Sequence, residues 1–377
     1  MCSSDLENYP NSNWMYFVHS YSAIPLEQEN TVAITKYGKE VRMRRSWAVG
    51  LIIISILTMA CGGAASVDDY KAAFVYVGPA DDGGWSQAHD VGRQFLVDET
   101  GIETAYTELI PEDATEFRTV AEAYIEQGYN IIFGTTFGYI DAMAEMAEEY
   151  PDVIFLHCSG YLSNDSNFGN YFGKMYQPRY LSGLAAGAIT ESNKIGYVAA
   201  FPIPEVIRGI NAFATGVKEV NPNATVEVVW TFTWFGPEEE TQAANALIET
   251  GVDVLAQHQD SPSTGVVAES NGAKWISYNT AYGKDAAPGA FVTAPVWAWG
   301  PYYVDVVNSI IDGEFSGGAY WGGMDTGLVS LYELSSDVPS DISDLISQRS
   351  DEIINGDFDP PIVEEEFIDN VIGTVSP

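Results

Sequence analysis

Short apolar runs alternate with amphipathic helical patterns from Lys71 onward, and this alternation restricts the fold more than any other feature. Residues 72–77 form a continuous apolar run that ends at Gly78 and Pro79, which is typical of a strand covered on both faces. Apolar residues at 117–125 then recur at helical spacing, and a second apolar run follows at 131–133. Such alternation predicts parallel sheets with helices on both faces.

The pattern occurs twice along the chain. Further strands are expected at 153–156, 195–198, 226–230, 252–256 and 275–278, with helices near 140–147, 206–217, 239–250 and 263–270. A helix end, a glycine and a strand at 125–132 recur at 248–255, although any helix–strand junction can show this pattern. A length of 377 residues also suits two domains. We therefore predict an α/β protein of two doubly wound lobes, with a ligand cleft at the carboxyl ends of the strands.

Composition excludes several classes of protein. Hydrophobic residues make up 46% of the chain, which is enough for a buried core. Lys and Arg number 16 against 53 Asp and Glu, a formal charge of −37 that disfavours nucleic acid and anionic lipid surfaces as partners. Three cysteines cannot form a disulfide framework, and Cys158, at the end of an apolar run, is expected to be buried and inert.

The N-terminal region resembles an export signal. Arg44 and Arg45 precede the apolar run 47–60, which is too short to span a bilayer as a helix and is followed by Cys61. We predict a signal peptide at 43–60, preceded at 1–42 by a segment without a fold signal, and a linker at 61–69. Cys61 is the candidate acceptor of a lipid anchor, although Thr58-Met59-Ala60 would also suit ordinary signal peptidase.

The loops after the predicted strands carry the side chains with binding chemistry. Aromatic faces stack on flat ligands, and amides, carboxylates and imidazoles read donors and acceptors on a ligand's edge. The candidate ligand-binding residues are Trp85, His89, Phe137, Trp234, Phe235, Gln257, His258, Asp260, Asn279 and Trp297.

Each candidate also has a structural alternative. Trp85 can be a lid that packs on its own lobe, and one of Trp297 and Trp299 is expected to face the core. His258 and Asp260 lack a third ligand, so a metal site is disfavoured. Dinucleotide, phosphate-loop, serine-nucleophile and zinc-protease motifs are absent from the sequence, which argues against an enzyme and against a cofactor.

From Lys71 to about Gly373 the chain resembles the basic membrane protein family of bacterial lipoproteins, which are substrate-binding components of ABC importers. The segments that carry the resemblance are Phe74-Val75-Tyr76-Val77-Gly78-Pro79, Asp82-Gly83-Gly84-Trp85, Gln127-Gly128-Tyr129-Asn130-Ile131-Ile132, Gly209-Ile210-Asn211-Ala212-Phe213, Gly216-Val217 and Asn221-Pro222. The resemblance implies a type I periplasmic-binding-protein fold with three crossovers between the lobes. On this basis we divide the chain into lobe 1 at 70–174, lobe 2 at 175–293, a return to lobe 1 at 294–320 and a C-terminal segment on lobe 2 and the hinge at 321–377.

The resemblance also implies a purine ligand stacked between aromatic side chains of the two lobes. It assigns the walls to Trp85, Phe137 and Trp234 or Phe235. Asn279 stands where nucleoside receptors of the family usually carry an aspartate, and Trp297 stands where they carry a lysine. The loss of both charges favours a base such as adenine over a nucleoside.

Under this interpretation Gln257, His258 and Asp260 would hold the edge of the base. The implied partners are an ABC permease and the membrane, reached through Cys61, for a monomer outside the cytoplasm. The alternatives are a receptor for a sugar or another small metabolite and, from a different class, a purine nucleoside hydrolase or phosphorylase.

The charge of −37 generates a prediction about stability. Added salt should raise the melting temperature of the mature protein, because counterions screen repulsion among the surface carboxylates. Thermal melts from low salt to molar NaCl measure the effect. A melting temperature that falls steadily over that range would contradict the prediction.

Overall fold

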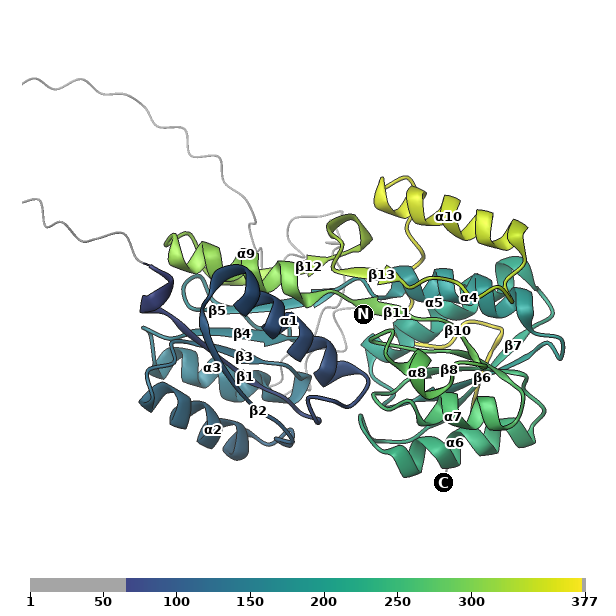
Figure 1. Ribbon diagram of the computed structural model, residues 1–377, viewed down its shortest axis with the longest axis horizontal. Helices are drawn as coiled ribbons and strands as arrows, with labels where there is room; N and C mark the ends of the chain where they lie inside the picture. Colours follow the sequence, from purple (N-terminus) through teal and green to yellow (C-terminus); the bar gives the residue numbers. More distant parts are fainter. Residues whose placement is uncertain (1–65, 375–377) are drawn as a thin grey trace, which may run out of the picture. The chain divides into compact units, whose positions relative to one another are not determined.

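Two six-stranded parallel sheets, each covered by helices on both faces, organise residues 66–374, which are those that the computed structural model describes (Figure 1). The order of strands in the first sheet is β12-β5-β4-β3-β1-β2. Its strands are β1 (Lys71–Val75), β2 (Glu103–Thr107), β3 (Ile131–Gly134), β4 (Ile154–Cys158), β5 (Phe168–Gly173) and β12 (Gly318–Gly322). The first lobe therefore takes its last strand from a segment far along the chain.

The second sheet has the order β10-β9-β8-β6-β7-β14. Its strands are β6 (Lys194–Ala199), β7 (Thr225–Trp230), β8 (Val254–His258), β9 (Lys274–Ile276), β10 (Phe291–Thr293) and β14 (Val371–Thr374). The two sheets share the doubly wound arrangement and each gains one late strand at an edge. The expected α/β fold of two parallel-sheet lobes is confirmed.

Helices cover both faces of each sheet, as Figure 1 shows. In the first lobe α1 (Trp85–Thr100) packs against α9 (Trp299–Ile311) on one face, and α2 (Ala114–Glu126) packs with α3 (Ile140–Glu149) on the other. In the second lobe α4 (Tyr176–Ile189) packs with α5 (Pro204–Val220), and α6 (Pro237–Glu249) packs with α7 (Ser263–Ser270). The remaining helical segments are α8 (Gly283–Ala286), α10 (Ser340–Ile354) and the 3-10 turns η2 (Val67–Asp69), η3 (Phe137–Tyr139) and η4 (Met324–Thr326).

Two short strands link the lobes. β11 (Pro295–Trp297) leads from the second sheet toward α9, and β13 (Val329–Leu331) leads from β12 toward α10. They pair with each other in an antiparallel ladder, in which Val296 lies opposite Ser330 (Figure 1). The chain also crosses between β5 and α4, so three crossovers connect the lobes. The residue boundaries of the domains given above stay a proposal.

The observed elements differ from the expected ones in a few places. Residues 85–89, expected in a loop, form the first turns of α1, and the strand expected at 252–256 lies at 254–258. Consequently Gln257 and His258 end a strand instead of following one. Cys158 is a buried free thiol, as expected, and burial raises its pKa well above the ordinary value. The predicted signal peptide and Cys61 lie outside the described residues, among whose helices none is long and apolar enough to cross a membrane.

Close packing of α4 against α5 depends on two glycines. A Cβ atom on Gly183 would lie 2.0 Å from the carbonyl oxygen of Phe213, and one on Gly216 would lie 2.1 Å from that of Tyr180. Both distances are far below van der Waals contact, so each helix meets the backbone of the other at a glycine. A side chain at either position would force the helices apart.

Replacing Gly216 by alanine should therefore destabilise the protein by about 1–3 kcal/mol, the usual cost of overpacking a core. Chemical denaturation of the wild type and Gly216→Ala measures the difference. Thr215→Ala, at the next position of α5, is the matched control and should change stability by less than about 0.5 kcal/mol. Equal stability of Gly216→Ala and the wild type would show that α4 and α5 do not pack this closely.

Candidate functional site

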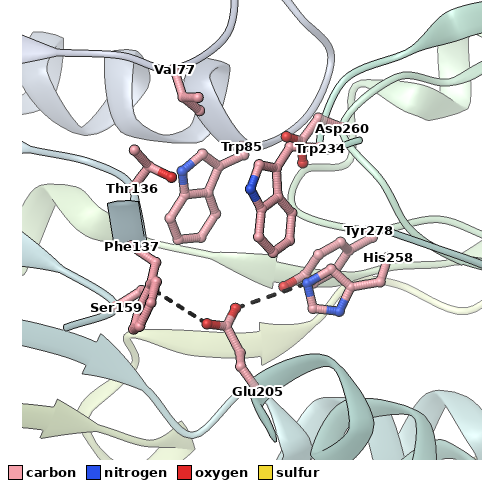
Figure 2. A pocket seen from close by; sticks show the side chains of 10 residues that line it. All are labelled: Val77, Trp85, Thr136, Phe137, Ser159, Glu205, Trp234, His258, Asp260 and Tyr278. Atoms are coloured by element: carbon pink, nitrogen blue, oxygen red, sulfur yellow. Dashed lines mark hydrogen bonds and ion pairs between the residues drawn. The ribbon is translucent and has the colours of Figure 1, made fainter. Parts of the chain in front are cut away.

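A pocket lies where loops and helix ends of the two lobes meet (Figure 2). The space between its lining residues amounts to about 370 Å³ when the part open to solvent is counted. The lining residues are Val77, Trp85, Thr136, Phe137 and Ser159 from lobe 1 and Glu205, Trp234, His258, Asp260 and Tyr278 from lobe 2. Five of the ten candidates from the sequence are among them: Trp85, Phe137, Trp234, His258 and Asp260.

Trp85 is held rigidly at the first position of α1. The carboxylate of Asp82 caps this helix by accepting hydrogen bonds from the backbone N–H groups of Gly84 at 2.7 Å, Ser86 at 2.9 Å and Gln87 at 3.0 Å. The indole Nε1 of Trp85 donates to the carbonyl oxygen of Thr135 at 2.6 Å. The indole is therefore fixed from its own helix and from the strand beside it.

A column of stacked rings supports Trp85 from behind. The rings of His89 and Trp299 lie parallel at 4.7 Å, and those of Trp299 and Trp297 at 4.5 Å. Trp85 stands nearly perpendicular to all three. His89 is fully buried, its Nδ1 lies 2.5 Å from the hydroxyl of Tyr303, and burial lowers its pKa well below the ordinary value. His89 and Trp297 therefore do not line the pocket but pack behind one of its walls.

Trp234 supplies the wall from the second lobe. It lies in the loop after β7, with its ring 5.0 Å from that of Phe201. Its Nε1 donates to Glu112 of the first lobe at 3.3 Å, which ties the two lobes together at the pocket rim. Figure 2 shows the indoles of Trp85 and Trp234 at the top of the view, above Glu205. Phe235, the alternative candidate for this wall, is not among the lining residues.

Glu205, at the start of α5, reaches into the pocket between Ser159 and His258. Its carboxylate accepts a hydrogen bond from the Ser159 hydroxyl at 3.3 Å and lies 3.9 Å from Nε2 of His258, as the dashed lines in Figure 2 mark. Burial raises the pKa of Glu205 to about 7, against smaller opposing effects of Arg208 and Ser159. Burial, with Arg179 and Arg208 nearby, lowers the pKa of His258 well below its ordinary value, so the imidazole is neutral. The pair offers a carboxyl group that can donate or accept, beside a neutral imidazole.

Asp260 forms the second polar group of the pocket. Its Oδ1 accepts from the amide of Asn279 at 2.9 Å, and the Asn279 oxygen accepts from Trp297 Nε1 at 3.0 Å. Burial raises the pKa of Asp260 well above the ordinary value, and the nearby carboxylates of Asp82 and Glu240 raise it further. Asn279 and Trp297 therefore act through Asp260, and neither lines the pocket.

Gln257 is used internally. Its amide nitrogen donates to the backbone oxygens of Gln259 at 3.0 Å and Ser261 at 2.8 Å, and its oxygen accepts from Trp275 Nε1 at 2.9 Å. These bonds shape the loop after β8 that carries Asp260. Residues 66–374 contain no cluster of three His, Cys, Asp or Glu side chains suited to a metal ion.

Sequence reasoning missed five lining residues: Val77, Thr136, Ser159, Glu205 and Tyr278. Each follows or ends an expected strand of the two lobes, so the rule that ligands bind at strand ends included them. No local signal separated them from their neighbours. The elevated pKa of Glu205 arises from its burial in the folded protein, which no sequence pattern reveals.

The amino-acid sequence is similar to those of substrate-binding proteins of ABC transporters. The model of the family described as "ABC transporter substrate-binding protein PnrA-like" matches residues 70–359. A candidate ABC transporter glucose-binding protein of Haloferax volcanii is 44% identical over 79% of this chain and 75% of its own length. A purine-binding protein of Brucella abortus is 36% identical over 82% of this chain and 88% of its own length.

Solved structures agree on the fold. A solute-binding protein of an ABC transporter system from Aeropyrum pernix K1 superposes with a TM-score of 0.67 at 18% identity, covering 78% of this chain and 95% of that one. At this identity the similarity concerns the fold alone.

The pKa of Glu205 predicts a stability difference that depends on pH. With a pKa of about 7, Glu205 binds its proton more tightly in the folded protein than in the unfolded chain. The stability gained from this proton is therefore complete below about pH 4.5 and is lost as the pH rises through 7. Glu205→Gln cannot ionise. Relative to the wild type it should therefore gain about 1–3 kcal/mol between pH 5 and pH 8.

Urea denaturation of both proteins at the two pH values measures this gain. Glu238→Gln, which removes an exposed carboxylate at the start of α6, is the control and should show no such gain. A constant difference between wild type and Glu205→Gln at both pH values would contradict the elevated pKa.

Proposed function

Because this chain belongs to the family of PnrA-like ABC transporter substrate-binding proteins, whose members bind solutes outside the cytoplasm and are not enzymes, we propose that it captures a purine base for import. The base would lie between Trp85 of the first lobe and Trp234 of the second. An adenine-like base is favoured over a nucleoside.

The observation that carries the proposal is that the polar atoms of the aromatic walls are already used. Trp85 Nε1 binds the Thr135 carbonyl, Trp234 Nε1 binds Glu112, and the Thr136 hydroxyl also binds Glu112. Trp85 and Trp234 can therefore contact a ligand mainly through the faces of their indole rings. Stacking a base on an aromatic side chain contributes roughly 1–3 kcal/mol, which suits a flat heterocycle better than a polyhydroxylated ring.

The polar groups that remain suit the edge of a neutral base. Glu205, with a pKa of about 7, and Asp260, with a raised pKa, can each present a protonated oxygen as donor and a second oxygen as acceptor. The neutral imidazole of His258 adds one more atom that can form a hydrogen bond with the ligand. The lining residues include no Lys or Arg, so a phosphate or a carboxylate ligand would find no countercharge at the pocket surface.

The proposed preference for a base over a nucleoside is based on the two residues hydrogen-bonded in series next to Asp260. Asn279 and Trp297 occupy the positions at which the family resemblance implies an aspartate and a lysine. The Asn279 amide donates to Asp260 and accepts from the Trp297 indole, so both side chains are engaged with each other or with Asp260 instead of facing ribose hydroxyls.

Glucose is the second candidate ligand, because the Haloferax volcanii relative that is 44% identical to this chain is named for glucose binding. Glucose needs hydrogen bonds for several hydroxyls around a ring. The pocket supplies polar groups from Glu205, His258, Asp260 and Tyr278, while the hydroxyl groups of Thr136 and Ser159 already donate to Glu112 and Glu205. We therefore place glucose second, and the experiment below includes it.

Delivery to an ABC permease, anchoring through a lipid on Cys61 and a monomeric state complete the proposal. The family supports the permease as partner. The signal peptide and the anchor lie outside the described residues and rest on the sequence pattern alone.

Titration calorimetry with adenine and with glucose tests the ligand. Adenine should bind with a Kd of about 1 μM, near −8 kcal/mol. Trp85→Ala and Trp234→Ala should each weaken adenine binding by about 10- to 100-fold, because each removes one stacking face.

Trp321→Ala is the matched control, since Trp321 lies on β12, is 45% exposed and does not line the pocket. It should leave the affinity unchanged. Binding of glucose with no binding of adenine would overturn the purine assignment while leaving the transport class intact.

A further inference from the structure

Arg179 carries a positive charge inside the second lobe, and no carboxylate within residues 66–374 forms an ion pair with it. The residue lies on α4 and is fully buried. Its Nη1 donates to the backbone oxygen of Gln257 at 2.7 Å, and its guanidinium lies 3.6 Å from the centre of the Tyr278 ring. Among the described residues, Nε and Nη2 have no hydrogen-bond partner. Burying charged donors in this way is costly unless something accepts their hydrogen bonds.

A second buried polar atom without a partner lies close by. Nδ1 of His258 is buried and makes no hydrogen bond within residues 66–374, whereas Nε2, at the other edge of the imidazole, faces Glu205. Arg179 and His258 also share a neighbour, since the rings of His258 and Tyr278 lie 4.6 Å apart and the Arg179 guanidinium covers Tyr278. Arg179 and His258 thus direct three unsatisfied atoms into one region behind the pocket.

Gly209 leaves room in that region. Gly209 lies on the buried side of α5, and a Cβ atom on it would be 3.8 Å from Nε of Arg179 and 3.9 Å from Nδ1 of His258. These two atoms and Cγ of Arg179, at 3.9 Å, are its nearest neighbours, and all three lie at ordinary van der Waals contact distance, so a methyl group would fit there without crowding. The other glycines of α4 and α5 are instead crowded by backbone at 2.0–2.8 Å. The missing side chain therefore leaves a space about as large as a methyl group between the two side chains.

We propose that this space binds a single halide ion, chloride under physiological conditions, held by Arg179 and His258 beside Gly209. Arg179 Nε and Nη2 can only donate, so the occupant must accept, and an anion also offsets the buried positive charge. Phosphate and sulfate are too large for a space of this size. The acidic group nearest the ring, Glu205, faces Nε2 and hydrogen-bonds Ser159, so it does not fill this role.

The ion would also set the chemistry of the pocket. To donate to it, neutral His258 must carry its proton on Nδ1, which leaves Nε2 as an acceptor. Nε2 then faces the pocket ready to accept from a ligand N–H or from the protonated Glu205 carboxyl. The site thus couples a buried ion to one edge of the binding pocket without touching the ligand.

Diffraction from crystals of the mature protein grown in sodium bromide tests the site directly, because bromide scatters anomalously. We expect an anomalous peak within hydrogen-bond distance of Arg179 Nε and His258 Nδ1. A peak absent from this position, with density that refines as water, would overturn the proposal.

Thermal melts give a second reading in solution. At equal ionic strength of about 1 M, the melting temperature should be a few degrees higher in sodium chloride than in sodium gluconate, because the ion binds only the folded state. Gly209→Ala should abolish this difference, because its methyl group enters the space at ordinary contact distance. Arg179→Met should abolish it by removing the donors.

Arg93→Met is the matched control, since Arg93 is a largely buried cation already paired with Asp90 at 2.7 Å. It should keep the chloride difference of the wild type. If Arg179→Met fails to fold, Gly209→Ala still decides. A chloride difference that persists in Gly209→Ala together with a missing bromide peak would rule the site out, and neither result depends on the identity of the transported ligand.

Discussion

The hydrogen bond from Trp85 Nε1 to the carbonyl of Thr135 places an indole at the mouth of the first lobe, and the proposed function depends on that placement. An exposed tryptophan on a loop would lose much of its stacking energy to conformational entropy. Here the Asp82 cap fixes the helix start, and the column of His89, Trp299 and Trp297 fixes the ring. The wall exists before a ligand arrives, which lowers the cost of binding.

Burial determines the chemistry of the polar groups. The pKa values of Asp82, Glu240 and Glu205 rise to about 6, 7 and 7, because burial removes the water that stabilises the ionised form of each carboxyl group. The protein has a formal charge of −37, yet the two carboxyl groups that line its pocket, Glu205 and Asp260, have raised pKa values and take up a proton more readily than exposed carboxylates do. Such a site can hold a neutral ligand by donor and acceptor pairs without charge repulsion.

Sequence patterns predicted the elements whose buried faces are hydrophobic. Strand β3 is fully buried and reads as an apolar run, so its position was predicted to within one residue. Helix α1 was missed because its buried face consists of small and polar residues, among them Ser86, His89 and Gly92, which show no apolar periodicity. The packing of Trp299 and Tyr303 against this face replaces the missing hydrophobic stripe.

The residues of the candidate site were also predicted only in part. Trp85, Trp234 and Asp260 were found because the carboxyl ends of parallel strands converge. The same rule predicted His89 and Trp297 to be binding residues, yet both pack behind Trp85. Whether a side chain lines the pocket or packs behind its wall depends on the direction in which it points, and tertiary contacts determine that direction. Glu205 was missed because its burial beside Ser159 and His258 depends on tertiary contacts that the surrounding sequence does not show.

A crystal structure of the mature protein grown with adenine would show directly whether a base binds between the two indoles. We expect density for a flat ring in the pocket, with its faces against Trp85 and Trp234 and its edge within hydrogen-bond distance of Glu205 or Asp260. Adenine bound outside the pocket, or a pocket in which the two indoles turn away from the bound ligand, would contradict this expectation.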